Sequence, residues 1–209
     1  MIKLSPNLVR ASLLGVIAAG LLSACSQEPA EAPPPPTAEP APATPAVVGP
    51  VQLTFTGAGV GEIGPGTPLD RARIQGLFPG AEVKVETFEG EMAFDIITVR
   101  REDGLALDIF PGLEAGQVGQ VFGRGGPVVG AGGEQLGAAW AEAGFDPATC
   151  VRGQDQLAGQ LICYRAGEPQ LGYMFDLPGY EGPDSEIPDA EFLTRAAKLS
   201  GFMWTAAAS

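Results

Sequence analysis

The stretch FDIITVRREDGLALDI, residues 94–109, has the pattern of a β-hairpin and sets the fold class. Four of the six residues from Phe94 to Val99 are apolar, and apolar residues alternate with other residues from Leu105 to Ile109. The intervening turn contains Asp103-Gly104, a dipeptide typical of tight hairpin turns because glycine easily adopts positive φ. The stretch therefore predicts two antiparallel strands joined by a short turn.

Further strand patterns lie on both sides of this hairpin. Five other short segments are rich in apolar residues, most of them alternating with polar ones, at residues 51–56, 82–86, 118–122, 171–175 and 199–204. Cys150 and Cys163 flank a polar tip and predict two more strands. We therefore expect about eight or nine strands.

Three segments carry helix signals. Thr67 followed by Pro68 predicts a helix N-cap and first turn, and this helix is expected to end near Phe78. Residues 134–143 and 190–197 predict two more short helices, because their apolar side chains recur at helical spacing. The glycine-rich residues before the second helix are expected to form a long turn, since they lack the Gly-Lys-Ser/Thr ending of a phosphate-binding loop.

These elements predict one α+β, β-rich domain over residues 51–204. We expect an antiparallel sheet or sandwich of about eight or nine strands with two or three short helices. Residues 25–50 consist mainly of proline, alanine, glutamate and threonine, a composition that cannot bury a core, so they are interpreted as a disordered tether. A proline-rich ligand for a partner is the alternative for this segment. Residues 205–209 are expected to be a frayed tail.

The first residues have the pattern of an export signal. Lys3 and Arg10 precede an apolar run at residues 11–22, which is too short to cross a bilayer as a helix because that needs roughly 20 residues. We therefore interpret residues 1–24 as a cleaved signal peptide. An uncleaved membrane anchor is the alternative.

The end of this signal carries the motif Leu22-Ser23-Ala24-Cys25, which resembles a lipobox. In a lipobox the chain is cut before the cysteine, which then carries lipid, so Cys25 is the expected lipidation site. Cleavage after Ala24 without lipid is the alternative. Ser26 rather than aspartate follows, a pattern that in Gram-negative lipoproteins indicates sorting to the outer membrane, here at its periplasmic face.

The cysteine count predicts one disulfide. Of the three cysteines, Cys25 is assigned to the lipid, which leaves Cys150 and Cys163. An even pair in an exported protein is typical of a disulfide because the compartment is oxidising. Two free thiols are the alternative.

The charge disfavours nucleic acid as a partner. The chain has 12 basic and 25 acidic residues, and loss of Lys3 and Arg10 with the signal peptide would change its formal charge from −13 to −15. Such a surface repels phosphate backbones and anionic lipid headgroups. The contact with the membrane is therefore expected to come from the lipid on Cys25.

The composition also narrows the available chemistry. The chain contains no histidine, which excludes Ser-His-Asp and Cys-His catalysis and imidazole metal sites. A disulfide would leave no thiolate in the domain. Two carboxylates could still hydrolyse a glycosidic bond if they were held about 5–9 Å apart. The candidates are Asp95, Asp108, Asp176, Glu181, Asp184 and Glu186.

The acidic segment near the C-terminus has three interpretations. A binding loop would comprise Tyr173, Asp176, Tyr180, Glu181, Asp184 and Glu186. A calcium site would draw on Asp176, Glu181, Asp184, Glu186 and Asp189, but their spacing differs from that of an EF-hand loop. A solvated acidic surface is the interpretation that we favour over calcium binding, and we expect neither a metal nor a cofactor.

Three separated segments carry a family resemblance. The first is Gly59-Val60-Gly61-Glu62-Ile63 followed by Thr67-Pro68-Leu69, the second is the pair Cys150 and Cys163, and the third contains Tyr173-Met174-Phe175, Gly182-Pro183, Pro188, Leu193, Lys198 and Trp204. Across residues 57–204 they resemble the RpoE-regulated lipoprotein family, whose domain has no known function. The resemblance implies an envelope lipoprotein with a β-rich domain, made in some bacteria under envelope stress, and it supplies no catalytic or binding residues. The longer proline-rich tether and the acidic charge depart from the family pattern.

These patterns favour a non-catalytic role in the bacterial envelope. We expect a monomeric lipoprotein that binds a protein, glycan or lipid partner. One alternative is a carboxylate-dependent hydrolase of cell-wall glycan, and another is a tethered inhibitor of a hydrolase. A concave pocket with two facing carboxylates would favour the enzyme, whereas an exposed apolar patch beside a projecting loop would favour the binding protein.

Overall fold

The computed structural model describes residues 52–89 and 93–207. The predicted signal peptide, Cys25 and the tether lie outside these residues. The described residues form eleven strands, three α-helices and two 3₁₀ turns. The strands are β1 Leu53–Thr56, β2 Gly59–Val60, β3 Glu82–Phe88, β4 Phe94–Arg100, β5 Ala106–Pro111, β6 Val118–Gly125, β7 Val128–Val129, β8 Cys150–Arg152, β9 Gln160–Arg165, β10 Glu168–Asp176 and β11 Lys198–Thr205. The helices are α1 Arg71–Leu77, α2 Trp140–Ala143 and α3 Ala190–Ala196, and the 3₁₀ turns are η1 Pro147–Thr149 and η2 Asp155–Leu157.

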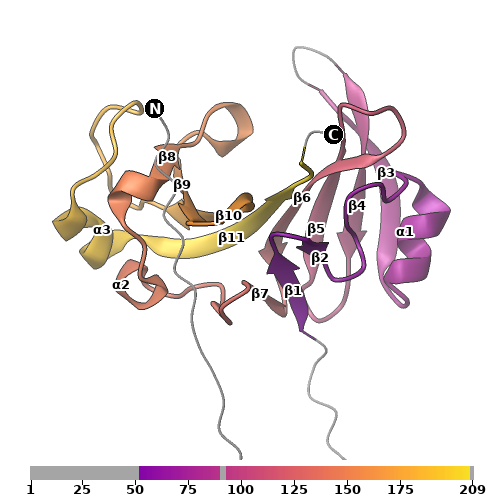
Figure 1. Cartoon of the computed structure of the whole chain (residues 1–209), viewed down its shortest axis with the longest axis horizontal. Helices are drawn as coiled ribbons and strands as arrows, with labels where there is room; N and C mark the ends of the chain where they lie inside the picture. The colour runs from indigo at the N-terminus through magenta and orange to yellow at the C-terminus, as the bar shows by residue number, and fades with distance from the viewer. Residues whose placement is uncertain (1–51, 90–92, 208–209) are drawn as a thin grey trace, which may run out of the picture. The chain divides into compact units, whose positions relative to one another are not determined.

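Most of the strands belong to one antiparallel sheet (Figure 1). Its eight strands follow the order β3-β4-β5-β6-β11-β10-β9-β8, so β3 and β8 are its edges. A smaller sheet has the order β2-β1-β7, in which β1 and β2 are antiparallel and β1 and β7 are parallel. The predicted α+β, β-rich class is confirmed.

The hairpin at residues 94–109 forms as predicted. Strands β4 and β5 pair with Ile97 opposite Ile109 and Val99 opposite Leu107. These four side chains point to the same face and are buried in the main core, because residues in direct register share a face of the sheet.

The main core lies between this face and the elements that pack on it. It contains Phe55 of β1, Ile74 of α1, Trp140 of α2 and Leu193 of α3, together with the fully buried Trp204 of β11. The Trp204 indole N–H donates to the Gly57 carbonyl at 3.2 Å and so joins the two sheets. The three helices and the small sheet thus share one hydrophobic core with the large sheet.

A second, smaller cluster occupies the opposite face of the large sheet. Phe88, Phe94, Phe110 and Phe122 come from the four neighbouring strands β3 to β6, and the centroids of the rings in contact lie 5.2–6.0 Å apart. Adjacent residues on a strand point to opposite faces, so Phe110 belongs to this cluster while Ile109 belongs to the main core. The large sheet is therefore apolar on both faces.

The first helix begins later than predicted. The Thr67 hydroxyl accepts from the Gly64 N–H at 3.0 Å, and the Thr67 carbonyl accepts from Val118 N–H at 2.9 Å. These bonds hold Thr67 in a turn against β6. Asp70 is the N-cap instead, because its carboxylate accepts from the Arg73 N–H at 2.8 Å.

The second helix is shorter than predicted: the expected residues 134–143 contain only the single turn α2. Gly137 has a φ of 85°, which interrupts a right-handed helix. Its N–H donates to the Leu199 carbonyl at 2.7 Å, and the Leu199 N–H donates to the Ala138 carbonyl at 2.9 Å. These residues therefore pair with the start of β11 instead of forming helical bonds.

The last strand continues past the expected end of the domain at residue 204. Strand β11 includes Thr205, and the Ala206 N–H donates to the Gly119 carbonyl at 2.8 Å. Pairing with β6 thus holds the first two residues of the segment predicted to be frayed.

Candidate binding groove beside strand β8

The candidate site is built around Arg152, the last residue of the edge strand β8. Only 7% of its side chain is exposed, although it carries a charge. Its Nε donates to the Asp184 carbonyl at 3.0 Å, and its Nη2 donates to the Asp184 carboxylate at 3.2 Å. Its guanidinium lies 5.2 Å from the centre of the Tyr180 ring, a distance that allows a cation–π interaction. Arg152 therefore fastens the acidic loop, residues 177–189, to the edge of the sheet.

One donor of Arg152 has no acceptor. Its Nη1 is buried and makes no hydrogen bond among the residues that the structure describes. A buried donor without a partner costs about 1–3 kcal/mol, which the Tyr180 ring offsets in part by about 0.5–2 kcal/mol. The site thus contains a buried cation with unused hydrogen-bonding capacity.

A shallow groove of about 600 Å³ lies beside Arg152. One wall comes from β8 and the tip that follows it, including Val151 and Gln154, and the other from the acidic loop, including Asp184 and Ile187. Val151 is 51% exposed and Ile187 is 40% exposed, and both are among the few large apolar side chains that the described domain exposes. The groove therefore combines apolar contact area with polar groups from Arg152 and Asp184.

The disulfide holds the strand that forms this wall. Cys150 of β8 and Cys163 of β9 are bonded and lie directly opposite each other in the ladder. The predicted disulfide is confirmed. Because β8 pairs only with β9 and has three residues, this covalent bond anchors its position at the sheet edge.

The structure brings together part of the predicted binding loop and separates the rest. Tyr180 and Asp184 meet at Arg152, and the Tyr180 hydroxyl lies 3.5 Å from the Glu186 carbonyl. Glu181 is exposed on the same loop. Asp176 instead ends β10, where its carboxylate accepts from Gln160 at 2.8 Å.

Tyr173 lies elsewhere, in the main core, with none of its surface exposed. Its hydroxyl is 3.5 Å from Glu134, and Arg165 lies over its ring at 5.4 Å. Burial raises the pKa of Tyr173 above its ordinary value, Arg165 acts against this shift, and the negative charge of Glu134 adds to it. Tyr173 therefore belongs to an internal polar cluster and not to the groove.

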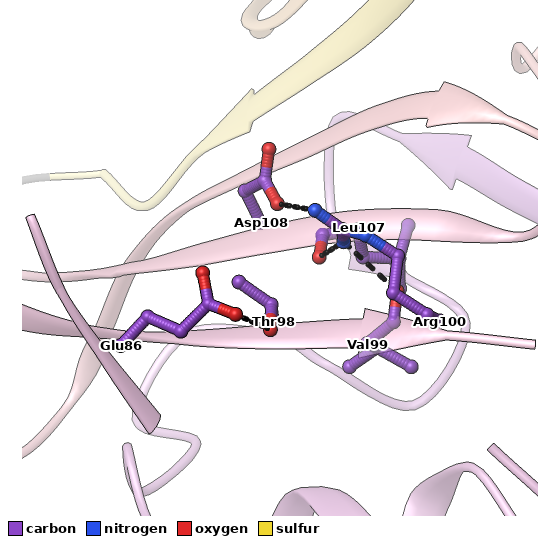
Figure 2. Close-up of polar contacts among 6 residues, drawn as sticks. All are labelled: Glu86, Thr98, Val99, Arg100, Leu107 and Asp108. Atoms are coloured by element: carbon purple, nitrogen blue, oxygen red, sulfur yellow. Dashed lines mark hydrogen bonds and ion pairs between the residues drawn. The ribbon is translucent and has the colours of Figure 1, made fainter. Parts of the chain in front are cut away.

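The carboxylates proposed for catalysis are dispersed among other partners. Figure 2 shows Asp108 on the β4–β5 hairpin, where its carboxylate accepts from Arg100 Nη2 at 2.6 Å. The same arginine donates to the Leu107 carbonyl at 2.6 Å, and nearby Thr98 donates to Glu86 at 3.3 Å. Asp95 accepts from Thr87 across β3 and β4 at 3.1 Å. Among the described residues no hydrogen bond or ion pair joins two of the six candidates, and the carboxylates of Asp95, Asp108, Asp176 and Asp184 each bond another residue.

Neither a metal centre nor a membrane-spanning helix is found in the described part of the chain. Residues 52–89 and 93–207 contain no group of three or more aspartate, glutamate or cysteine side chains placed to hold a metal ion. The acids suggested as calcium ligands are therefore not gathered into such a group. No helix within these residues has the length and apolar composition that a membrane crossing requires.

Sequence reasoning missed the centre of the groove. Arg152 lies 32 residues before Asp184, and no local pattern pairs them. Val151 and Ile187 also carry no distinguishing signal, because isolated apolar residues are common in strands and loops. The one usable signal was the Cys150–Cys163 pair, which predicted a short strand and a polar tip at this position.

Fold and groove together define a β-rich α+β domain with an open groove at one sheet edge. No family model and no curated protein matches the chain. Among solved structures, it is similar to the uncharacterized protein yfeY from Escherichia coli, with a TM-score of 0.58 and 16% identity over 74% of this chain and 99% of that one. A similarity at this identity shows a shared fold.

Proposed function

We propose that this protein is a bacterial envelope lipoprotein whose β-rich domain binds a partner without catalysing a reaction. A lipid on Cys25 would anchor it at the periplasmic face of the outer membrane, and residues 25–50 would act as the tether. The motif at residues 22–25 supports the anchor, and the resemblance of residues 57–204 to the RpoE-regulated lipoprotein family supports the envelope role.

The observation that carries the binding role is the groove beside β8. Exposed apolar side chains next to a projecting loop are typical of interaction sites. Val151 and Ile187 supply such side chains, and Arg152 and Asp184 supply polar groups that could orient a ligand. We therefore assign partner binding to the groove beside β8.

The arrangement of the carboxylates favours binding over glycan hydrolysis. A carboxylate glycosidase needs two acids about 5–9 Å apart that face one substrate. Here Asp108 is held by Arg100, Asp176 by Gln160 and Asp184 by Arg152. These contacts stabilise the domain and support a non-catalytic interpretation.

Processing of the N-terminus tests the anchor. Inhibition of lipoprotein signal peptidase should make the larger precursor accumulate, and Cys25→Ser should do the same, because the lipidated cysteine defines the cleavage site. Ser26→Ala is the control and should leave maturation intact. Normal processing of Cys25→Ser would overturn the lipoprotein assignment.

Chemical crosslinking in intact cells tests the binding role. Covalent complexes identified by mass spectrometry should contain one recurrent envelope partner. The yield of that complex should fall in a Val151→Lys variant, because a charge in the groove opposes apolar contact. Recovery of no recurrent partner would contradict the proposed function.

A further inference from the structure

We propose that the free edge of β8 accepts an extended, basic segment of a protein partner as an added strand. This inference rests on the proposed function and names the class of partner that the groove fits. Strand addition uses the unpaired backbone groups of a sheet edge for affinity and side-chain contacts for specificity.

The first support is the direction of the backbone groups of β8. The Gly153 N–H donates to the Gln160 carbonyl at 2.9 Å, so Gly153 and Gln160 form a hydrogen-bonded pair. Such pairs alternate along an antiparallel ladder, which places Arg152 in a non-hydrogen-bonded pair with Leu161. The backbone N–H and C=O of Arg152 therefore point away from β9, towards the open edge. Among the described residues no turn, loop or cap bond uses them.

The second support is the space beside this edge. The groove of about 600 Å³ follows β8 and is bounded by the tip after the strand and by the acidic loop. Alternate side chains of an added strand would point to opposite faces, so one set could contact Val151, and Ile187 lies across the groove on the loop. Arg152 itself lines this groove, where it holds the acidic loop in place through Asp184.

The third support is charge. Residues 181–191 contain five carboxylates and no lysine or arginine, and Asp184 at the groove is 87% exposed. Arg152 is the cation beside the groove, and it is buried and already paired with Asp184. The loop therefore presents net negative charge to an incoming segment, which favours lysine or arginine side chains on the partner.

The other edge of the large sheet differs in a way that favours β8. At β3 the Arg71 Nε of helix α1 donates to the Val83 carbonyl at 3.0 Å, so a side chain already occupies one of its backbone acceptors. Strand β3 also alternates Glu82, Lys84 and Glu86, and charged edge strands resist pairing. The edge at β3 is protected, whereas the edge at β8 has a groove.

Peptide binding to the purified full-length chain in detergent tests the inference. The probe is a short fluorescent peptide that alternates lysine with valine, followed by anisotropy. We expect saturable binding that weakens at least about tenfold when every backbone nitrogen of the peptide is methylated, because strand pairing needs its N–H groups. A matched peptide that alternates glutamate with valine should bind at least about tenfold more weakly, because the loop repels it.

Two protein variants locate the binding. Val151→Lys should weaken binding of the lysine–valine peptide at least about tenfold, whereas Val85→Lys should not change it. Val85 is a matched control because it is also on an edge strand and also 51% exposed. Equal thermal melts by circular dichroism would show that both variants fold.

Four results would overturn the inference: absence of peptide binding, equal binding of the methylated peptide, equal or tighter binding of the glutamate–valine peptide, or equal effects of the two valine variants. If crosslinking still recovers a partner, the proposed binding role stands and only the added strand is wrong. If crosslinking recovers none, the proposed function itself fails.

Discussion

Glu134, paired with Arg165, is the most buried carboxylate among the ion pairs of the described residues. Glu134 is 11% exposed and Arg165 is 35% exposed, and Arg165 also donates to the Ala143 carbonyl at 2.9 Å. Its guanidinium lies over the Phe145 ring at 4.6 Å. This contact network links the segment before α2 to β9. Its contribution should exceed that of an exposed pair, because one charge would remain largely buried if the other were removed.

Substitution of Arg165 tests that difference. Arg165→Ala should lower the free energy of unfolding by about 2 kcal/mol, reduced from the value for a fully buried pair because Arg165 is about one third exposed. Arg100→Ala is the control, since Arg100 and Asp108 are 45% and 24% exposed and such pairs contribute about 0–1 kcal/mol. Urea unfolding of both variants measures the two values. Equal losses of unfolding free energy in the two variants would contradict a larger contribution from the ion pair with the buried Glu134.

The phenol groups predict an effect of alkaline pH on stability. Burial raises the pKa of Tyr164, and burial together with Glu134 raises that of Tyr173, above the ordinary value of 10.0. A raised pKa means that the folded state keeps the proton more tightly, so this contribution is complete below pH 10 and is lost as the pH rises through the folded-state pKa. Tyr173→Phe should therefore flatten the fall in stability above pH 10. A fall in stability as steep as that of the wild type would contradict this assignment.

Tyr173 also shows how far a residue's role could be predicted. Its alternation with Leu171 and Phe175 correctly predicted a strand, and all three side chains are fully buried in the main core. The prediction of a binding role was separate and came from proximity to the acidic loop. It failed because the Tyr173 side chain is fully buried in the main core, where it contacts Glu134 and Arg165 and leaves no surface for a partner.

At the scale of elements, the disulfide between β8 and β9 should determine whether the groove keeps its shape. It closes the segment from Cys150 to Cys163, a separation of 13 residues. Cross-linking a loop of this length contributes about 3 kcal/mol, mainly by restricting the unfolded chain. The rest of β8 is held by a short ladder to β9 and by the contacts of Arg152 with the acidic loop.

The double variant Cys150→Ser/Cys163→Ser measures this contribution. Its free energy of unfolding should be about 3 kcal/mol lower than that of the wild type. Addition of reductant should lower the wild-type value to a similar extent and leave the variant unchanged. If reductant destabilised the variant equally, the loss would not come from this disulfide.

The elements that could be predicted are those with strong local signals. The hairpin β4–β5 was accessible because both runs alternate or cluster apolar residues around Asp103-Gly104. The segment at residues 134–143 was not, because its apolar spacing fits a helix while its backbone bonds go to Leu199, which is distant in sequence. Long-range pairing overrides local propensity here.

At the scale of the whole domain, the groove exists only because separate parts of the chain meet. Strand β8, the tip with η2 and the acidic loop before α3 contribute to it, and Arg152 reaches Asp184 across 32 residues. The sequence predicted an acidic loop and a cysteine-bounded tip as separate features. Their contact depends on the order β11-β10-β9-β8, which no local pattern specifies.

The joint between the two sheets provides a test of cooperativity. A Cβ at Gly123 of β6 would lie 2.5 Å from the Phe55 ring of β1, so Gly123→Ala must displace that ring from the shared core. We expect a loss of about 1–3 kcal/mol in the free energy of unfolding, typical of an overpacked core. Gly76→Ala in α1 is the control: nothing lies within 4 Å of its Cβ position, and helix propensity predicts a gain of about 0.5–1 kcal/mol.

Tryptophan fluorescence and circular dichroism should give coincident single transitions in both variants, because Trp140 and Trp204 lie in the core that all three helices share. Separate transitions in Gly123→Ala would mean that the small sheet and the large sheet fold independently.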